Sequence, residues 1–147
     1  MIKLLDIHKV FGGLELITHD GRLIPLTYEE MKKFDLDLEF GQMGEKFVED
    51  LQNGNTKIEV KTERDIWKTT GNIAVEIRYK NKPSGISTTG SSIWIHLLSD
   101  NDKIVGGYIF SVDYLKKKII ELKEKGKLKL VMGGDFNASQ MALIPRT

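Results

Sequence analysis

Residues 57–80 read KIEVKTERDIWKTTGNIAVEIRYK, and apolar and charged residues alternate along both ends of this stretch. A period of two is typical of strands that lay one face against a core. It predicts one strand over residues 57–63 and a second over residues 73–80, joined by a loop from Arg64 to Gly71. We expect the two strands to pair as an antiparallel hairpin.

The apolar residues of the two strands set the expected register. Aligning them places Glu59 directly across from Glu76, with Lys61 beside the pair. Opposed residues in an antiparallel pair have Cβ atoms about 4.5–5.5 Å apart, so two like charges there cost stability. We therefore expect a compensating interaction at this position.

The N-terminal third is expected to be scaffold. Residues 2–10 and 14–18 alternate well enough to predict a small hairpin around Gly12-Gly13, and Asp20-Gly21 is a second turn signal. The sequence predicts a single α/β domain over residues 1–147, with residues 1–36 as an N-terminal scaffold extension.

Two helices are expected before the hairpin. Thr27 followed by Glu30 is a capping pattern that predicts the start of a short helix. Apolar residues at helical spacing predict a longer helix from Gly41 to Leu51, which Asn53-Gly54 would end.

The remaining elements are expected in the C-terminal half. A loop rich in hydroxyl groups over residues 82–92 leads into strands at 93–98 and 103–110. A helix follows, capped by Ser111 or Asp113 and stopped by Gly126, and a last strand covers residues 127–132.

Composition limits the chemistry more than it assigns it. The chain of 147 residues has a formal net charge of +1, but residues 61–147 carry 15 basic and 9 acidic side chains and could face an anion. It has no cysteine, which excludes disulfides, thiolate metal ligands and thiol nucleophiles. No apolar run approaches the ~18 residues of a membrane span, so we expect no membrane partner and a cytoplasmic location.

Glu59, Lys61 and Glu76 together have the composition of a site for metal-assisted phosphodiester hydrolysis. Carboxylates can hold Mg²⁺ or Mn²⁺, and an ammonium group can orient the water or offset transition-state charge. The alternative is a solvated charged face of a sheet. Glu45 could complete the set from its helix or be an ordinary exposed helix residue.

The three histidines, His8, His19 and His96, have no metal-ligand spacing. His96 lies between apolar neighbours and is expected to be a strand residue with a hydrogen bond. We expect no histidine-based site.

The sequence resembles the PD-(D/E)XK nuclease superfamily, and within it small phage-type proteins of the resolvase-like or endonuclease-like kind. The resemblance covers roughly residues 37–98, with a further likeness in Gly133-Gly134-Asp135 and Leu143-Ile144-Pro145. It is carried by four segments: residues 37–45, 57–62, 71–76 and 83–89.

This resemblance implies a restriction-endonuclease-like fold, with a central mixed β-sheet flanked by helices and a helix glutamate at Glu45. Two motif assignments stay open. In one, Glu59-Val60-Lys61 is the acid-x-Lys motif of the family, and no clear acid precedes it at the position of the first acid. In the other, Glu59 is the first acid, and Glu76-Ile77-Arg78 is the acid-x-Lys motif with Arg in place of Lys.

The implied activity is a divalent-metal-dependent DNA endonuclease, structure-selective if it is resolvase-like, acting in the host cytoplasm if phage-encoded. Whether it acts as a homodimer stays open. Glu45, Glu59 and Glu76 would hold Mg²⁺ or Mn²⁺, and Lys61 would assist. The alternative is a non-catalytic nucleic-acid-binding or phage accessory protein with the same fold. The expected contacts to nucleic acid are Arg64, Lys68, Arg78, Lys80, Lys82, Ser84, Thr88 and Thr89.

Overall fold

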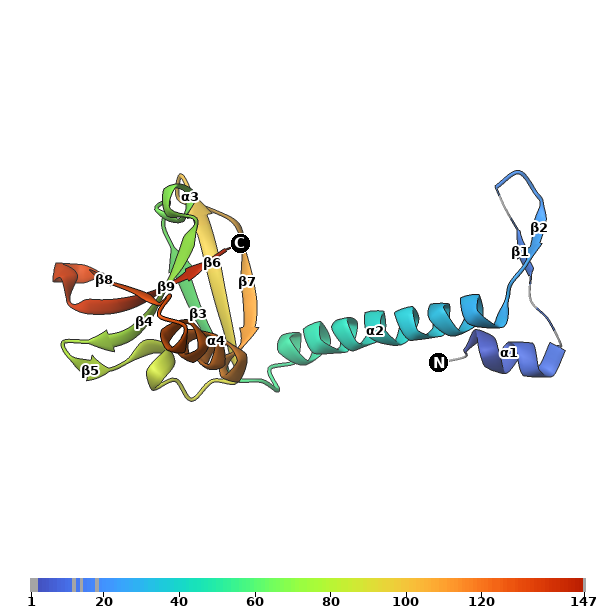
Figure 1. Ribbon diagram of the computed structural model, residues 1–147, viewed down its shortest axis with the longest axis horizontal. Helices are drawn as coiled ribbons and strands as arrows, with labels where there is room; N and C mark the ends of the chain where they lie inside the picture. The colour runs from blue at the N-terminus through green and yellow to red at the C-terminus, as the bar shows by residue number, and fades with distance from the viewer. Residues whose placement is uncertain (1–2, 12, 14, 18, 147) are drawn as a thin grey trace. The chain divides into compact units, whose positions relative to one another are not determined.

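The computed structural model describes residues 3–11, 13, 15–17 and 19–146 (Figure 1). The chain divides into two compact units, Met1–Asn55 and Thr56–Thr147. The scaffold extension expected over residues 1–36 is therefore part of a unit that continues to Asn55.

The N-terminal unit begins with a helix where a strand was expected. The helix α1 (Leu4–Phe11) is followed by the strands β1 (Glu15–Ile17) and β2 (Leu23–Pro25), which pair as an antiparallel hairpin. The prediction of a strand over residues 2–10 is wrong, and Gly12, Leu14 and Thr18 lie outside the described residues. The buried Asp35 carboxylate accepts hydrogen bonds from the amides of Leu4 and Leu5, at 2.7 and 3.1 Å. These bonds satisfy free donors at the first turn and favour the helix.

One long helix, α2 (Tyr28–Gln52), replaces the two helices that were expected. Its capping box is confirmed, because the Thr27 side chain accepts from the Glu30 amide and the Glu30 carboxylate accepts from the Thr27 amide. The helix ends before Asn53 as expected. It is continuous because no proline interrupts residues 28–52, and glycines at 41 and 44 lower helix propensity without forbidding the conformation.

The C-terminal unit contains two sheets. The first has the order β3-β6-β7, formed by Ile58–Glu63, Ile93–Asp100 and Lys103–Ser111. The strands β3 and β6 are parallel, and β6 and β7 are antiparallel. The unit is therefore mixed α/β with a mixed sheet, as expected.

The second sheet has the order β5-β4-β9-β8, and all of its pairs are antiparallel. Its strands are Lys82–Pro83, Asn72–Tyr79, Ser139–Pro145 and Lys129–Gly133. The apolar C-terminal segment is part of this sheet, and Ala142 and Ile144 of β9 are buried.

The hairpin expected between β3 and β4 is wrong. Glu59 pairs with Trp94 of β6, whereas Glu76 pairs with Met141 of β9, so the two glutamates do not face each other across a ladder. The connection between β3 and β4 covers residues 64–71 and contains the short helix α3 (Trp67–Thr70). This connection is too long for a tight hairpin turn. The strand β6 is largely buried and has β3 on one edge and β7 on the other.

The core of this unit lies around β4, β6 and the helix α4 (Val112–Glu124). As expected, Ser111 caps α4, and its hydroxyl accepts from the Tyr114 amide at 3.0 Å. The 3₁₀ helix η1 (Gly85–Ser87) inserts Ile86 into the same core, and η2 (Asp135–Asn137) connects β8 to β9. The buried cluster comprises Ile73, Val75, Ile86, Trp94, Leu98, Val112, Leu115 and Ile144.

Among the described residues, no helix has the length and apolar character needed to cross a bilayer.

Candidate active site

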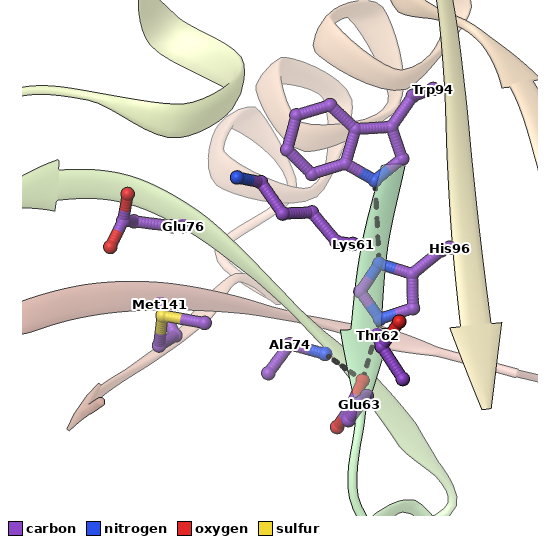
Figure 2. Close-up of a pocket in the computed structure, with 8 residues that line it drawn as sticks. All are labelled: Lys61, Thr62, Glu63, Ala74, Glu76, Trp94, His96 and Met141. Atoms are coloured by element: carbon purple, nitrogen blue, oxygen red, sulfur yellow. Dashed lines mark hydrogen bonds and ion pairs between the residues drawn. The ribbon is translucent and has the colours of Figure 1, made fainter. Parts of the chain in front are cut away.

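A cavity of ≈ 190 Å³ lies between β3 and β4, where the two strands diverge (Figure 2). Both strands contribute side chains, although they belong to different sheets. The two strands that carry the predicted residues Lys61 and Glu76 thus both line this cavity, without pairing in one sheet. The lining residues are Lys61, Thr62, Glu63, Ala74, Glu76, Trp94, His96 and Met141.

The charged face of β3 is the half-buried one. Glu59, Lys61 and Glu63 are each partly buried, whereas Val60 between them is 52% exposed. A strand that lays one face on a core normally turns its apolar residues inward. The reversal in β3 brings three ionisable side chains to the inner face.

Lys61 is oriented by two neighbours. Its ammonium lies 2.7 Å from the Glu59 carboxylate and 6.0 Å from the centre of the Trp94 ring. Figure 2 shows its side chain extending into the gap toward β4, the strand that carries Glu76. Glu59 thus balances the charge of Lys61.

A chain of two hydrogen bonds, which we call the relay, runs from Trp94 through His96 to Glu63 and orients the Glu63 carboxylate. The Trp94 indole can only donate, so its bond of 3.3 Å to His96 Nδ1 makes that nitrogen an acceptor. The hydrogen of the ring is therefore on Nε2, which donates to Glu63 Oε2 at 2.7 Å. His96 is 1% exposed and both of its nitrogens are occupied, which confirms the expectation of a hydrogen-bonded strand histidine.

Glu63 also bridges the two strands. Its Oε2 accepts from the Ala74 amide of β4 at 3.0 Å, in place of a backbone partner on that edge. Both bonds use Oε2, and Oε1 accepts none from the described part of the chain. Sequence reasoning did not select Glu63, although its position two residues after Lys61 on the same face was a usable signal.

Glu76 is held by two hydroxyl groups. The hydroxyl of Ser139 in β9 donates to Oε1 at 2.5 Å, and that of Ser84 donates to Oε2 at 3.1 Å. The β4–β9 register shifts directly after Glu76, and such bulges change the direction of neighbouring side chains. Each carboxylate oxygen keeps a second lone pair for a ligand.

Gly85 permits the approach of the loop to Glu76. Its φ is +57°, and a Cβ atom there would lie 2.3 Å from the Glu76 carbonyl oxygen. Only glycine fits this conformation and this spacing. The residue places Ser84 within reach of the carboxylate.

Glu45, the fourth predicted catalytic residue, lies on α2 in the N-terminal unit, and its side chain is exposed. Its participation stays a prediction.

The expected nucleic-acid contacts fall into two groups. Arg64, Arg78, Lys80, Lys82 and Thr88 are exposed. Three others have partners within the chain. Lys68 lies 2.5 Å from Asp100, and this hydrogen bond raises the pKa of the lysine. The Ser84 hydroxyl donates to Glu76, and the Thr89 hydroxyl accepts from the Ser91 amide.

The acidic residues of the cavity are the groups to compare with the needs of a metal ion. In the described part of the chain, no three acidic or histidine side chains gather around a common point. Mg²⁺ usually keeps several waters and binds one or two carboxylates together with phosphate oxygens of the substrate. Glu63 and Glu76 both line the cavity and can supply two such carboxylates.

No protein-family model matches the chain, and neither the curated proteins nor the solved structures contain a match to it.

Proposed function

We propose that the protein is a divalent-metal-dependent nuclease that hydrolyses phosphodiester bonds in DNA, with a restriction-endonuclease-like arrangement of its site. The observation that carries the proposal is the cavity that Lys61, Glu63 and Glu76 all line, with each of the three held by neighbouring side chains. Such fixed charges are typical of catalytic sites, because an oriented group need not reorganise during the reaction.

The residues take distinct roles in this proposal. Glu63 and Glu76 would hold Mg²⁺ or Mn²⁺, which would make a water more acidic and offset phosphate charge. Lys61 stabilises the negative charge that develops on the phosphoryl oxygens during water attack. Glu59, placed by sequence reasoning among the metal ligands, instead positions Lys61 through their ion pair.

The surroundings of the site favour a polyanionic substrate. Arg78, Lys80 and Lys82 follow Glu76 within six residues and are exposed. Exposed cations beside a site attract phosphate backbones and release counterions on binding. The cavity itself is small, so we propose that it receives a single phosphate group of a longer chain.

A plasmid-nicking assay tests the proposal. Supercoiled, single-stranded and branched DNA are each incubated with the protein in Mg²⁺, in Mn²⁺ and in excess chelator. We expect cutting only with metal, and we expect Glu76→Gln to abolish it. Glu124→Gln changes an exposed glutamate at the end of α4 and should cut normally.

Two results would contradict the proposal. Undiminished cutting in chelator would exclude the metal-dependent chemistry. Tight DNA binding without any cutting, in every metal and on every substrate, would favour the non-catalytic nucleic-acid-binding alternative.

A further inference from the structure

Phe136 is unusual among the large apolar side chains of the described residues, because its exposed fraction is 100%. It lies in η2, the turn between β8 and β9, where its φ is +57°. This left-handed conformation is rare for a bulky residue and is strained. A strained backbone that presents an aromatic ring to solvent is a reason to look for a ligand.

The turn that carries Phe136 lies beside a basic hairpin. Tyr79 of β4 pairs with Ser139 of β9, and the Lys80 amide donates to the Ala138 carbonyl at 2.9 Å. The β4–β5 and β8–β9 hairpins therefore end side by side, as Figure 1 shows. We call this pair of turns, residues 79–82 and 134–138, the hairpin tips.

The hairpin tips combine positive charge with aromatic rings. Arg78, Lys80 and Lys82 flank Tyr79, and the Lys80 ammonium lies 5.4 Å from the centre of the Tyr79 ring. Asp135 is the acidic residue of the second turn. Cations that track a phosphate backbone, alternating with rings on which bases stack, are the features of single-strand binding surfaces.

The second hairpin tip leads directly into Ser139, the first residue of β9. Ser139, which binds Glu76, is three residues after Phe136. Three residues of chain span at most about 10 Å, a distance comparable to a few stacked nucleotides. One nucleic-acid strand could therefore reach both the cavity and the Phe136 ring.

We infer that Phe136 stacks on an unpaired nucleobase a few nucleotides from the bond that is cut, while Lys80 and Lys82 contact the adjoining phosphates. The inference rests on the proposed function for its substrate class and deepens it, since it assigns a preference for DNA with unpaired bases. A fully paired duplex keeps its bases stacked and would offer the ring no face without first being opened.

Fluorescence of 2-aminopurine tests the inference without requiring cleavage. The full-length protein is titrated, in chelator, into single-stranded and branched DNA that carries 2-aminopurine at successive positions. Stacking on Phe136 should quench the probe at one position and leave the others little changed. Loss of one stacking contact should weaken binding roughly ten-fold or more.

Three variants define the expected result. Phe136→Ala should lose the position-specific quenching and the affinity, and Phe136→Trp should restore both, because the indole has a stacking face. Met132→Ala removes a half-exposed apolar side chain from the neighbouring strand β8 and should behave as the wild type. Circular dichroism and melting temperature must be alike in all proteins compared.

Several outcomes would overturn the inference. Equal quenching by Phe136→Ala, or equal affinity for fully paired and unpaired DNA, would exclude stacking by this ring. A wild-type dimer that Phe136→Ala converts to a monomer, seen by sedimentation, would make the residue a self-association contact. If the probe is quenched as expected but the nicking assay is negative, the stacking of Phe136 on an unpaired base holds and the proposed function fails.

Discussion

At the scale of single residues, the candidate site depends on hydrogen bonds that select one orientation for each charged group. Glu76 has a serine on each oxygen, and Glu63 has a histidine whose tautomer is fixed by an indole. The serines lie on different elements, so the carboxylate depends on the positions of both.

Removal of one serine should slow cutting more than it weakens binding. In Ser139→Ala, Glu76 keeps its charge but loses the shorter of its two bonds. We expect a roughly ten-fold lower single-turnover rate with an unchanged dissociation constant, because small losses of orientation act mainly on the transition state. Ser92→Ala, an exposed serine outside the cavity, is the control. Equal losses of rate and affinity would argue against a positioning role.

The relay of Trp94, His96 and Glu63 should matter for stability as well. In His96→Leu a buried indole N–H loses its acceptor and Glu63 loses a donor. Leaving a buried polar group unpaired costs about 1–3 kcal/mol, so the free energy of unfolding should fall by about this amount or more. Urea denaturation measures it. A variant as stable as the wild type would mean that the relay is not formed.

At the scale of elements, the loop at η1 and the strand β3 can be tested separately. Gly85→Ala should disturb the site, because the added Cβ meets the backbone of Glu76. We expect a lower melting temperature and loss of cutting. Gly90→Ala, in the same loop but with open space around it, should be close to neutral. If both substitutions were neutral, Ser84 would not be held against Glu76 in this way.

The orientation of β3 leads to a second prediction at this scale. Val60 is half-exposed and Ile73 of β4 is buried. Val60→Thr should change the unfolding free energy by less than about 0.5 kcal/mol, whereas Ile73→Ala should cost about 2–5 kcal/mol. A large loss of unfolding free energy in Val60→Thr would mean that Val60 faces the core, as the predicted hairpin requires.

Local signals in the sequence predict most elements of this chain. The strands predicted near residues 57–63 and 73–80, the capping box at Thr27 and the cap at Ser111 each depend on neighbours in the chain, and all four are confirmed. The expected inward face of β3 is not, because Val60 is exposed. Pairing involves distant residues: β3 could satisfy its edge with β4 or with β6, and its alternation is the same in both cases. The helix α1 was missed because its stabilising partner, Asp35, lies about thirty residues away.

The residues of the cavity were also predictable only where local patterns in the sequence indicate them. Lys61 and Glu76 were found because their strands show a clear period of two, and both line the cavity. Ser139 could not be found, since its role depends on the β4–β9 register. The predicted opposition of Glu59 and Glu76 was wrong because it assumed that β3 pairs with β4, whereas β3 pairs with β6 and β4 with β9.

At the scale of the whole molecule, the division at Asn55 separates Glu45 from the cavity residues along the chain. The buried core cluster lies entirely within Thr56–Thr147. We therefore expect a fragment of residues 56–147 to unfold cooperatively on its own, as measured by circular dichroism in urea. A non-cooperative transition would mean that this core needs the N-terminal unit.

The most direct test of the central claim is the effect of Lys61→Ala on DNA cutting and DNA binding measured on the same substrate. We expect the single-turnover rate in Mn²⁺ to fall by about 10²–10³-fold, as is typical when a group that stabilises transition-state charge is removed. The dissociation constant should change little, because Lys61 is one cation among several near the substrate. Cutting at the wild-type rate, or equal losses of rate and affinity, would contradict the account.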